Sequence, residues 1–373
     1  MSVAPPLPEH DHAGRRERLR SQLADHGVAL LLVTDPLHVR YLAGFTGSSG
    51  QLLVGPAADQ DRLITDERYR DRAAAETPDV EVVLSREPGE VALAALAASG
   101  AVDGGLGVEA DHLTWAQARA LRERADEVGR GLIPTQGLVH QLRRVKDAAE
   151  LARLERACSI TQDALAWLVG EVVAPGRTER ELAVALERRF VDAGADGVAF
   201  PSIVAAGPNG ATPHHTPGER ALEVGDLLTV DCGAVVDGYH ADHTRTIGIG
   251  RVTGELAEVH ALVERAQAAG RAAAVAGATG GELDAAARSP IDAAGYRERF
   301  VHGTGHGVGL AIHEAPEVAV GATDRLVAGM ALTVEPGVYL PGVGGVRIED
   351  TLVVTADGPA RPLTDTPREL VLV

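Results

Sequence analysis

The sequence predicts two domains, an α/β layer domain in the N-terminal part and an α+β domain in the C-terminal part. The chain has 373 residues, of which 45% are hydrophobic, so it is too long for one ordinary core and can fill two. Short apolar runs and helical patterns alternate over the first part, which is typical of α/β layers. After Phe200, glycine, proline and β-forming residues dominate, which favours strands in the second part.

The α/β domain is expected over residues 1–135. Helical patterns cover residues 15–26, 91–99 and 114–125, and apolar runs of strand length cover 28–33, 81–84 and 105–109. A turn rich in glycine and serine separates two apolar stretches within residues 41–54. This turn, GFTGSSG, lacks the glycine offsets of a G-x-S-x-G nucleophile elbow, so no serine hydrolase is indicated.

The α+β domain is expected over residues 148–373, after a linker at 136–147 where the periodic pattern lapses. Apolar residues recur at helical spacing from Leu151, and Thr178 with Glu181 three residues later marks the start of a second helix. A third helical stretch covers residues 255–276. Glycine-punctuated strands are expected from residue 200 to 250 and again from residue 300 onward.

Charge and composition exclude several kinds of partner. With 53 acidic and 35 basic residues the formal net charge is −18, which repels nucleic acid and anionic lipid. No apolar run approaches the roughly 18 residues of a membrane helix, and the first residues lack the apolar core of a signal peptide. The two cysteines, Cys158 and Cys232, are too few for a disulfide framework. We therefore expect a cytoplasmic protein that binds neither nucleic acid nor membranes.

Two acidic residues are expected to meet on a β-hairpin in the middle of the α+β domain. The dipeptide Asp237-Gly238 favours a tight turn between its strands. A turn centred there places Asp231 opposite Thr244, with Asp242 as the diagonal neighbour on the same face. Two carboxylates at this distance repel each other unless a cation lies between them.

A second hairpin near the C-terminal end carries two further acidic residues, and its turn is expected within residues 341–345. Centring the turn on Val343 places Glu335 opposite Thr351 and makes Glu349 the diagonal neighbour on the same face. Both hairpins would then pair their carboxylates with the same offset.

A histidine strand lies between the two hairpins in the sequence. In the segment VHGTGHGVGL, which starts at Val301, glycines occupy alternate positions and exclude a helix. In an extended chain His302 and His306 share one face, and the glycine face lets another backbone approach closely. The two histidines are therefore not a helical zinc motif.

Five residues form an oxygen-rich set of candidate metal ligands: Asp231, Asp242, His306, Glu335 and Glu349. Such a set suits two Mn²⁺ ions, with Co²⁺ or Zn²⁺ as alternatives, because carboxylates can bridge adjacent ions. A pair of ions can supply a nucleophile and a Lewis acid for a carbonyl or phosphoryl oxygen. Any one of these acids alone would be read as a solvated turn residue, but their joint pattern predicts a two-metal hydrolase.

The same segments resemble the pita-bread-fold metallopeptidases, in the branch that holds aminopeptidase P and prolidase. The resemblance covers most of residues 200–363 and rests on GPNGATPHH, TVDCGAVVDGYHADHTRT, HGTGHGVGLAIHEAP, TVEPGVY and GGVRIEDT. All five ligand positions carry the expected residue types. The segment VRYLAGFTGSSGQLLV resembles the creatinase-like N-terminal domain of this family. The resemblance thus implies a creatinase-like α/β domain followed by a pita-bread α+β catalytic domain.

The resemblance also implies roles for individual residues. Asp231 would bind one ion, Asp242 and Glu349 would bridge, and His306 and Glu335 would complete the other, with Glu335 also able to carry a proton. The expected residues around the substrate are His214 and His313 at the oxyanion, His302 on the proline side, Tyr239, Tyr339 and Arg347 as orienting or binding residues, and Phe200 as an apolar wall.

The expected function is a Mn²⁺-dependent exopeptidase that releases an N-terminal residue ahead of proline, an Xaa-Pro aminopeptidase, acting as a homodimer on peptides with proline in second position. An Xaa-Pro dipeptidase is the alternative. Some dipeptide-specific relatives have a basic residue where this chain has Glu317, although Arg347 could supply the charge. Two further readings stay open, a relative that hydrolyses another amide or an ordinary dipeptide, and a binding protein that has lost catalysis.

Overall fold

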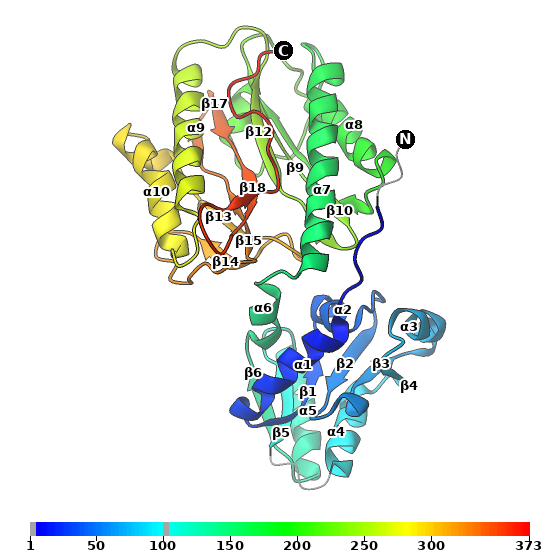
Figure 1. The fold of residues 1–373 in the computed structure, drawn as a ribbon. Coiled ribbons are helices and arrows are strands. Elements are labelled where there is room, and N and C mark those ends of the chain that lie inside the picture. The colour runs from blue at the N-terminus through cyan, green and yellow to red at the C-terminus, as the bar shows by residue number, and fades with distance from the viewer. Residues whose placement is uncertain (1–4, 100–103) are drawn as a thin grey trace. The chain divides into compact units, whose positions relative to one another are not determined.

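The computed structural model describes residues 5–99 and 104–373. These residues form two compact units (Figure 1). The first unit is Glu9–Arg143, and the second unit joins residues 5–8 to Arg144–Val373. Within the described residues, no helix is both long enough and apolar enough to cross a membrane.

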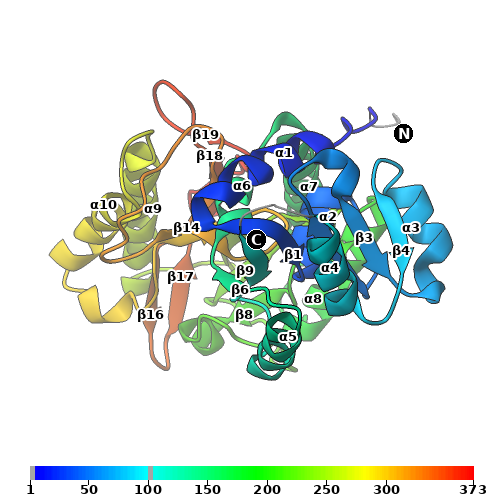
Figure 2. The same ribbon diagram turned by 90° about the horizontal axis from the view of Figure 1, so that it is seen from below.

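The first unit is a six-stranded mixed sheet with helices on both faces. Its main elements are α1 (His12–Leu23), β1 (Val28–Val33), α2 (Pro36–Ala43), β2 (Gly50–Val54), β3 (Arg62–Thr65), α3 (Arg70–Glu76), β4 (Glu81–Leu84), α4 (Pro88–Ala98), β5 (Gly105–Glu109), α5 (Trp115–Glu127), β6 (Leu132–Thr135) and α6 (Leu138–Arg143). The strand order is β4-β3-β2-β1-β5-β6, and Figure 2 shows α1 and α5 on opposite sides of this sheet.

The core of the first unit forms around β1, whose six residues are all buried. This strand runs antiparallel to β2 and parallel to β5, so it is covered on both edges as well as on both faces. Leu32 belongs to one apolar cluster with Leu93 and Leu96 of α4. A continuous apolar run is the pattern expected of a strand buried on both faces, so the bounds of β1 could be predicted from the sequence.

Three strands of the first unit, at 28–33, 81–84 and 105–109, confirm the sequence prediction. The segment expected as a linker, 136–147, contains α6, which belongs to the first unit. The preceding strand β6 was also not foreseen. Pro134 interrupts the strand pattern of β6, and six residues are too few to establish a helical period in α6, so neither element leaves a strong signal.

The described residues of the second unit form four sheets and several long helices. Its elements are α7 (Ala148–Trp167), η4 (Leu168–Val172), α8 (Glu179–Asp192), β7 (Gly197–Val198), β8 (Ile203–Ala206), η5 (Gly207–Ala211), β9 (Leu227–Cys232), β10 (Ala234–Val236), β11 (Tyr239–His240), β12 (His243–Gly248), α9 (Glu255–Ala273), α10 (Gly280–Ala293), β13 (Gly305–Gly307), β14 (Glu314–Val318), β15 (Ala331–Val334), β16 (Gly337–Leu340), β17 (Gly344–Arg347), β18 (Asp350–Val353) and β19 (Arg361–Pro362).

The strands of the second unit lie between two groups of helices. The sheets have the orders β11-β10-β7, β12-β9-β8 and β14-β13-β15-β18-β19, with β16 and β17 as a separate pair. Helix α9 packs beside α10 and against β17, whereas α7 packs against β10 and β11. Figure 1 shows α7 and α9 on opposite sides of the strands. This layering buries the strand faces that carry the polar residues of interest.

Helices α7 and α8 confirm the sequence prediction, and α8 begins with the expected capping box of Thr178 and Glu181. Helix α10 was not predicted from the sequence, although it also starts with a capping box. The Thr279 side chain accepts from the backbone N–H of Glu282, and the Glu282 side chain bonds back. Two glycines at its start and Pro290 inside it masked the helical pattern.

Candidate metal centre

Asp231 and Asp242 lie on the first hairpin in the register that the sequence predicts. Asp231 on β9 pairs with Thr244 on β12. The turn residues Asp237 and Gly238 have φ angles of 46° and 76°, as a tight hairpin turn of this type requires. Asp242 precedes Thr244 by two residues and therefore occupies the diagonal position. The predicted register of this hairpin is confirmed.

The register predicted for the second hairpin was wrong by one position on each strand. Thr351 on β18 pairs with Thr333 on β15 and not with Glu335. The hairpin turns around Gly342 instead of Val343, because Gly342 has a φ angle of 77° that a β-branched valine would adopt only with strain. The two hairpins therefore do not share the same carboxylate offset.

Glu335 and Glu349 lie where the two strands of the second hairpin part. The backbone N–H of Glu335 donates to Thr304 O, and that of Glu349 donates to Thr244 O at 3.1 Å. Glu349 is thereby attached directly to the first hairpin, which brings the two acidic hairpins together. Because the strands separate here, the backbone of Glu335 bonds to Thr304 and that of Glu349 bonds to Thr244, while both carboxylates remain in the same site.

His306 is held on β13 by backbone packing that only glycine neighbours allow. A Cβ atom at Gly305 would lie 2.1 Å from Thr333 O, and one at Gly307 would lie 2.2 Å from Ala315 O. The expected close approach of other backbones is confirmed. The His306 Nδ1–H donates to Gly307 O at 3.0 Å, which leaves Nε2 free to face the carboxylates.

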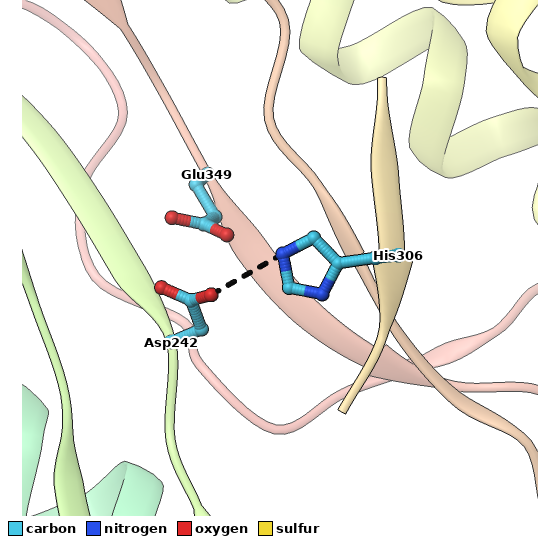
Figure 3. Close-up of side chains that lie close together, drawn as sticks. All are labelled: Asp242, His306 and Glu349. Carbon is cyan, nitrogen blue, oxygen red and sulfur yellow. Dashed lines mark ion pairs between the residues drawn. The ribbon is translucent and has the colours of Figure 1, made fainter. Parts of the chain in front are cut away.

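The carboxylates of Asp242 and Glu349 converge on the imidazole of His306 (Figure 3). One ligand atom from each of the three residues lies within 4.8 Å of the other two, as a shared metal ion would require. His306 Nε2 is 3.5 Å from Asp242 Oδ2 and 3.4 Å from Glu335 Oε1. Three predicted carboxylate ligands, Asp242, Glu335 and Glu349, thus lie around the His306 imidazole.

The fifth predicted ligand, Asp231, forms an ion pair with Arg347, whose Nη2 lies 2.6 Å from Asp231 Oδ2. The other oxygen, Asp231 Oδ1, is buried and has no hydrogen-bond partner among the described residues, and the same holds for Glu349 Oε1. Buried acceptors without a partner are costly in a folded protein. A bound cation would satisfy both oxygens, so the residues present fit divalent metal ions.

The electrostatics of the site also favour a cation. Burial, reinforced by the charge of Asp231, raises the pKa of Asp242 well above its ordinary value. Burial and the nearby Asp242 raise the pKa of Glu349 in the same way. Burial opposes a charge on His306, but hydrogen bonding and charge from Glu335 outweigh it and raise the His306 pKa to about 9. In the absence of an ion, His306 thus supplies the positive charge that the carboxylates need.

Tyr339 connects two other predicted residues in one hydrogen-bonded chain. Arg347 Nη1 donates to the Tyr339 hydroxyl at 3.0 Å, and the hydroxyl lies 2.8 Å from His302 Nε2. The His302 Nδ1–H donates to Gly303 O at 2.7 Å, so Nε2 accepts from Tyr339. Both ring nitrogens of His302 are therefore engaged, and the ring presents carbon atoms to its surroundings.

A cavity of about 790 Å³ opens over the cluster. Its walls include the predicted residues Phe200, His214, Asp231, Asp242, His302, His306, His313, Glu335 and Arg347. His313 stacks edge to face on His306, with 4.3 Å between ring centroids. Of the two adjacent histidines, His214 lines the cavity and His215 bonds to Glu179, as the expected register requires.

Tyr239 is not among the described residues that line this cavity. It is buried on β11, and its hydroxyl donates to Glu150 Oε1 of α7 at 3.2 Å. Its position on the hairpin directs the ring away from the acidic face and onto the helix. Tyr239 therefore packs between β11 and α7, and its role toward the substrate stays a prediction.

Two threonines that the sequence analysis did not single out orient the ligands. The Thr244 hydroxyl donates to Glu349 Oε2 at 2.7 Å. The Thr333 hydroxyl accepts from the His306 backbone N–H at 3.1 Å and donates to Glu335 Oε1 at 3.4 Å. Thr244 could have been found, because the predicted register placed it opposite Asp231. The wrong register of the second hairpin hid Thr333.

Comparisons with known families match both units. The profile of metallopeptidase family M24 matches residues 152–356, and that of the creatinase/prolidase N-terminal domain matches residues 15–145. The peptidase YqhT of Bacillus subtilis is 36% identical over 359 residues, which span 96% of this chain and 99% of that protein. The Xaa-Pro dipeptidases of Pyrococcus furiosus and Pyrococcus horikoshii are also among the curated relatives.

Solved structures agree with these matches. An Xaa-Pro dipeptidase from Bacillus anthracis has a TM-score of 0.91 at 38% identity, covering 97% of this chain and 100% of that one. An X-Pro aminopeptidase from Thermotoga maritima has a TM-score of 0.86 at 34% identity, covering 96% and 99%.

A cluster of carboxylates and one imidazole at the base of an open cavity defines a metal-dependent hydrolase. With the family matches, the chain belongs to metallopeptidase family M24, in the prolidase and aminopeptidase P branch, and is a metallo-exopeptidase. The predicted creatinase-like domain and pita-bread catalytic domain are confirmed.

Proposed function

We propose that the chain is an Xaa-Pro dipeptidase, which cleaves the peptide bond between an N-terminal residue and a C-terminal proline. The expectation from the sequence was an Xaa-Pro aminopeptidase, with the dipeptidase as its alternative. The relatives now favour the alternative, because Xaa-Pro dipeptidases recur among them and the Bacillus anthracis structure is the more similar of the two solved structures named above.

The preference for proline rests on the ring of His302. Both of its nitrogens are engaged by Tyr339 and Gly303, so the cavity wall at this point offers carbon atoms instead of hydrogen-bond donors. The same cavity is also lined by Phe200 and Ile312. Apolar surface of this kind suits a pyrrolidine ring, which has no N–H to satisfy when it forms a peptide bond.

The five ligands would hold two divalent ions, for which Mn²⁺ is the first choice because the set is rich in carboxylate oxygen. When bound, the ions would activate water and polarise the scissile carbonyl. His214 and His313 have exposed rings in the cavity and can donate hydrogen bonds to the carbonyl oxygen as negative charge develops. Glu335 Oε1 can take up the proton that the attacking water loses and pass it to the leaving proline nitrogen.

A second candidate, the aminopeptidase, is favoured by Glu317. This acidic residue lines the cavity, and it pairs with His306 across β13 and β14. Among the described residues that line the cavity Arg347 is the one arginine, and it already donates to Asp231. A free carboxylate on proline would therefore meet no unengaged arginine along the described cavity wall, whereas a longer peptide carries its carboxylate farther away.

The deciding experiment compares hydrolysis of Xaa-Pro dipeptides with that of Xaa-Pro-Yaa tripeptides, each with Mn²⁺ and with EDTA. A dipeptidase should cleave the dipeptide faster and lose this activity in EDTA. Faster cleavage of the tripeptide would assign the aminopeptidase. Xaa-Ala dipeptides serve as the control for proline preference, and failure to cleave any proline peptide would refute both candidates.

The assembly and location of the enzyme are further parts of this proposal. We expect a homodimer, as the family resemblance implies, and a cytoplasmic location, because two cysteines fit a reducing compartment. Light scattering coupled to size-exclusion chromatography would measure the mass in solution, and a mass of one chain would contradict the dimer.

A further inference from the structure

Glu179, the first residue of α8, is a buried carboxylate outside the metal centre. Its side chain has no exposed surface. Oε1 accepts from the backbone N–H of Ala206 at 2.8 Å and from the side chain of Asn209 at 2.9 Å. Oε2 accepts from His215 Nε2 at 2.8 Å and from the backbone N–H of Gly218 at 3.0 Å. Four donors thus meet on one side chain.

These donors lie at the two ends of one segment of the chain. Ala206 ends β8 and Asn209 follows in η5, whereas His215 and Gly218 come after the residues of the segment that line the cavity. Between them the chain places Pro213 and His214 on the cavity wall. Glu179 therefore fastens both ends of the segment that delivers His214.

The side chains of the two adjacent histidines, His214 and His215, point in different directions and have different roles. His215 turns toward Glu179, and His214 turns toward the cavity. Residues 212–220 form neither helix nor strand, so backbone pairing of a regular element does not fix the direction of His214. Instead, the hydrogen bond between Glu179 and His215 fixes the direction of the neighbouring His214.

The carboxylate of Glu179 is ionised in this setting. Burial acts to raise its pKa, but the four hydrogen bonds outweigh burial and leave the pKa below the ordinary value. Hydrogen bonds to an ionised acceptor are the stronger kind, so each end of the segment is held firmly. A neutral side chain of the same shape could not accept from all four donors.

We infer that Glu179 is a positioning residue, which fixes the direction of His214 toward the substrate by fastening residues 206–218. This inference rests on the proposed peptidase function. Glu179 contacts neither the predicted metal ligands nor the cavity, so its effect on catalysis must pass through His214.

The test starts with Glu179→Gln, which keeps the shape of the side chain but directs an NH₂ group at two of the four donors. Glu187→Gln is the matched control, because Glu187 lies on the same helix and accepts from the backbone N–H of Ser202 at 3.0 Å. We expect Glu179→Gln to lower kcat/KM for Xaa-Pro by about 10- to 100-fold, since small misplacements cost this much. Glu187→Gln should stay within about twofold of the wild type.

A double-mutant cycle with His214→Ala separates positioning from general damage. If Glu179 acts through His214, adding Glu179→Gln to the His214→Ala protein should change kcat/KM little further. Hydrogen exchange gives a readout independent of activity. Amides of residues 207–218 should exchange faster in Glu179→Gln, while those of β9 and β12 should keep their wild-type protection.

Additive losses in the cycle, or unchanged exchange over residues 207–218, would overturn the inference. If circular dichroism shows that Glu179→Gln does not fold, His215→Phe replaces it. This variant removes one of the four hydrogen bonds and keeps an aromatic ring at position 215. If the wild type cleaves no Xaa-Pro peptide, the proposed function fails, and the exchange measurement still decides whether Glu179 fastens the segment.

Discussion

Arg347 on the second hairpin donates a hydrogen bond to Asp231 on the first, with 2.6 Å between Nη2 and Oδ2. The arginine side chain is 3% exposed and also donates to Tyr339 and Thr244. Its charge is therefore fixed in place and balances one of the buried carboxylates before any metal ion binds. The rest of the negative charge is left for cations to neutralise.

Replacing Arg347 by Met should destabilise the protein, and more so without metal. The change leaves Asp231 as a buried charge that has lost its partner, which typically costs about 3 to 5 kcal/mol. Bound ions would offset part of that cost. Urea unfolding with EDTA and with Mn²⁺ measures both values. An equal loss in the two conditions would show that Asp231 does not face the metal.

Asp242→Asn should abolish nearly all turnover while the protein stays folded. Asparagine cannot bridge two ions as a carboxylate does, so metal affinity falls. In the metal-free protein the same change should raise the midpoint of thermal unfolding, because it removes a carboxyl group whose ionisation burial and Asp231 disfavour. Calorimetry in EDTA checks this rise, and a fall would contradict the repulsion.

Without metal, the stability of the protein should decline as pH rises from about 6.5 to about 9. His306 has its pKa raised from 6.5 to about 9, so the folded state holds the proton more tightly than the unfolded state. The resulting stabilisation is complete below pH 6.5 and is lost as pH passes through 9. Deprotonation of Asp242 and Glu349, whose pKa values burial raises, acts in the same direction.

Urea unfolding of the EDTA-treated protein across this pH range measures the decline, with His306→Gln as the matched variant. That variant should decline less, because the histidine proton no longer contributes. Constant or rising stability of the metal-free wild type over the range would rule out a protonated His306.

Gly305→Ala should destabilise the second unit and weaken metal binding together. The added Cβ would lie 2.1 Å from Thr333 O, so β13 must move and carry His306 with it. Overpacking of this kind costs about 1 to 3 kcal/mol. Gly197→Ala is the control, since no atom lies within 4 Å of the added Cβ among the described residues. Equal effects of the two substitutions on Mn²⁺ affinity would contradict the role of Gly305.

The contrast between the two hairpins shows how far the sequence can define this site. Asp237-Gly238 allows one kind of turn, so the register of Asp231 and Asp242 could be deduced before the structure was known. The loop around Gly342 holds three glycines and a proline within five residues, and several turns fit it. Moving the centre of the turn by one residue there pairs Thr351 with Thr333 instead of Glu335.

Contacts between distant segments were beyond the sequence. Nothing in the spacing of residues indicates that Arg347 meets Asp231, or that four donors converge on Glu179. Such pairs depend on how the sheets and helices pack in three dimensions. The ligand types were recognisable because each is chemically distinctive, whereas Thr333 is a common strand residue whose hydroxyl gains a role only from its neighbours.

Tyr239→Phe and Tyr339→Phe should have different effects although each removes one buried hydroxyl. Tyr239 donates to Glu150 away from the cavity, so its substitution should cost about 1 kcal/mol of stability and leave kcat/KM nearly unchanged. The Tyr339 hydroxyl joins Arg347 to His302, and its loss frees His302 Nε2 in the cavity wall. We expect Tyr339→Phe to raise KM for Xaa-Pro more than for Xaa-Ala, because the wall facing the proline ring becomes polar.

Steady-state kinetics on the two dipeptides, with urea unfolding of both variants, measures these effects. A larger loss of kcat/KM in Tyr239→Phe than in Tyr339→Phe would restore the substrate-binding role first expected for Tyr239.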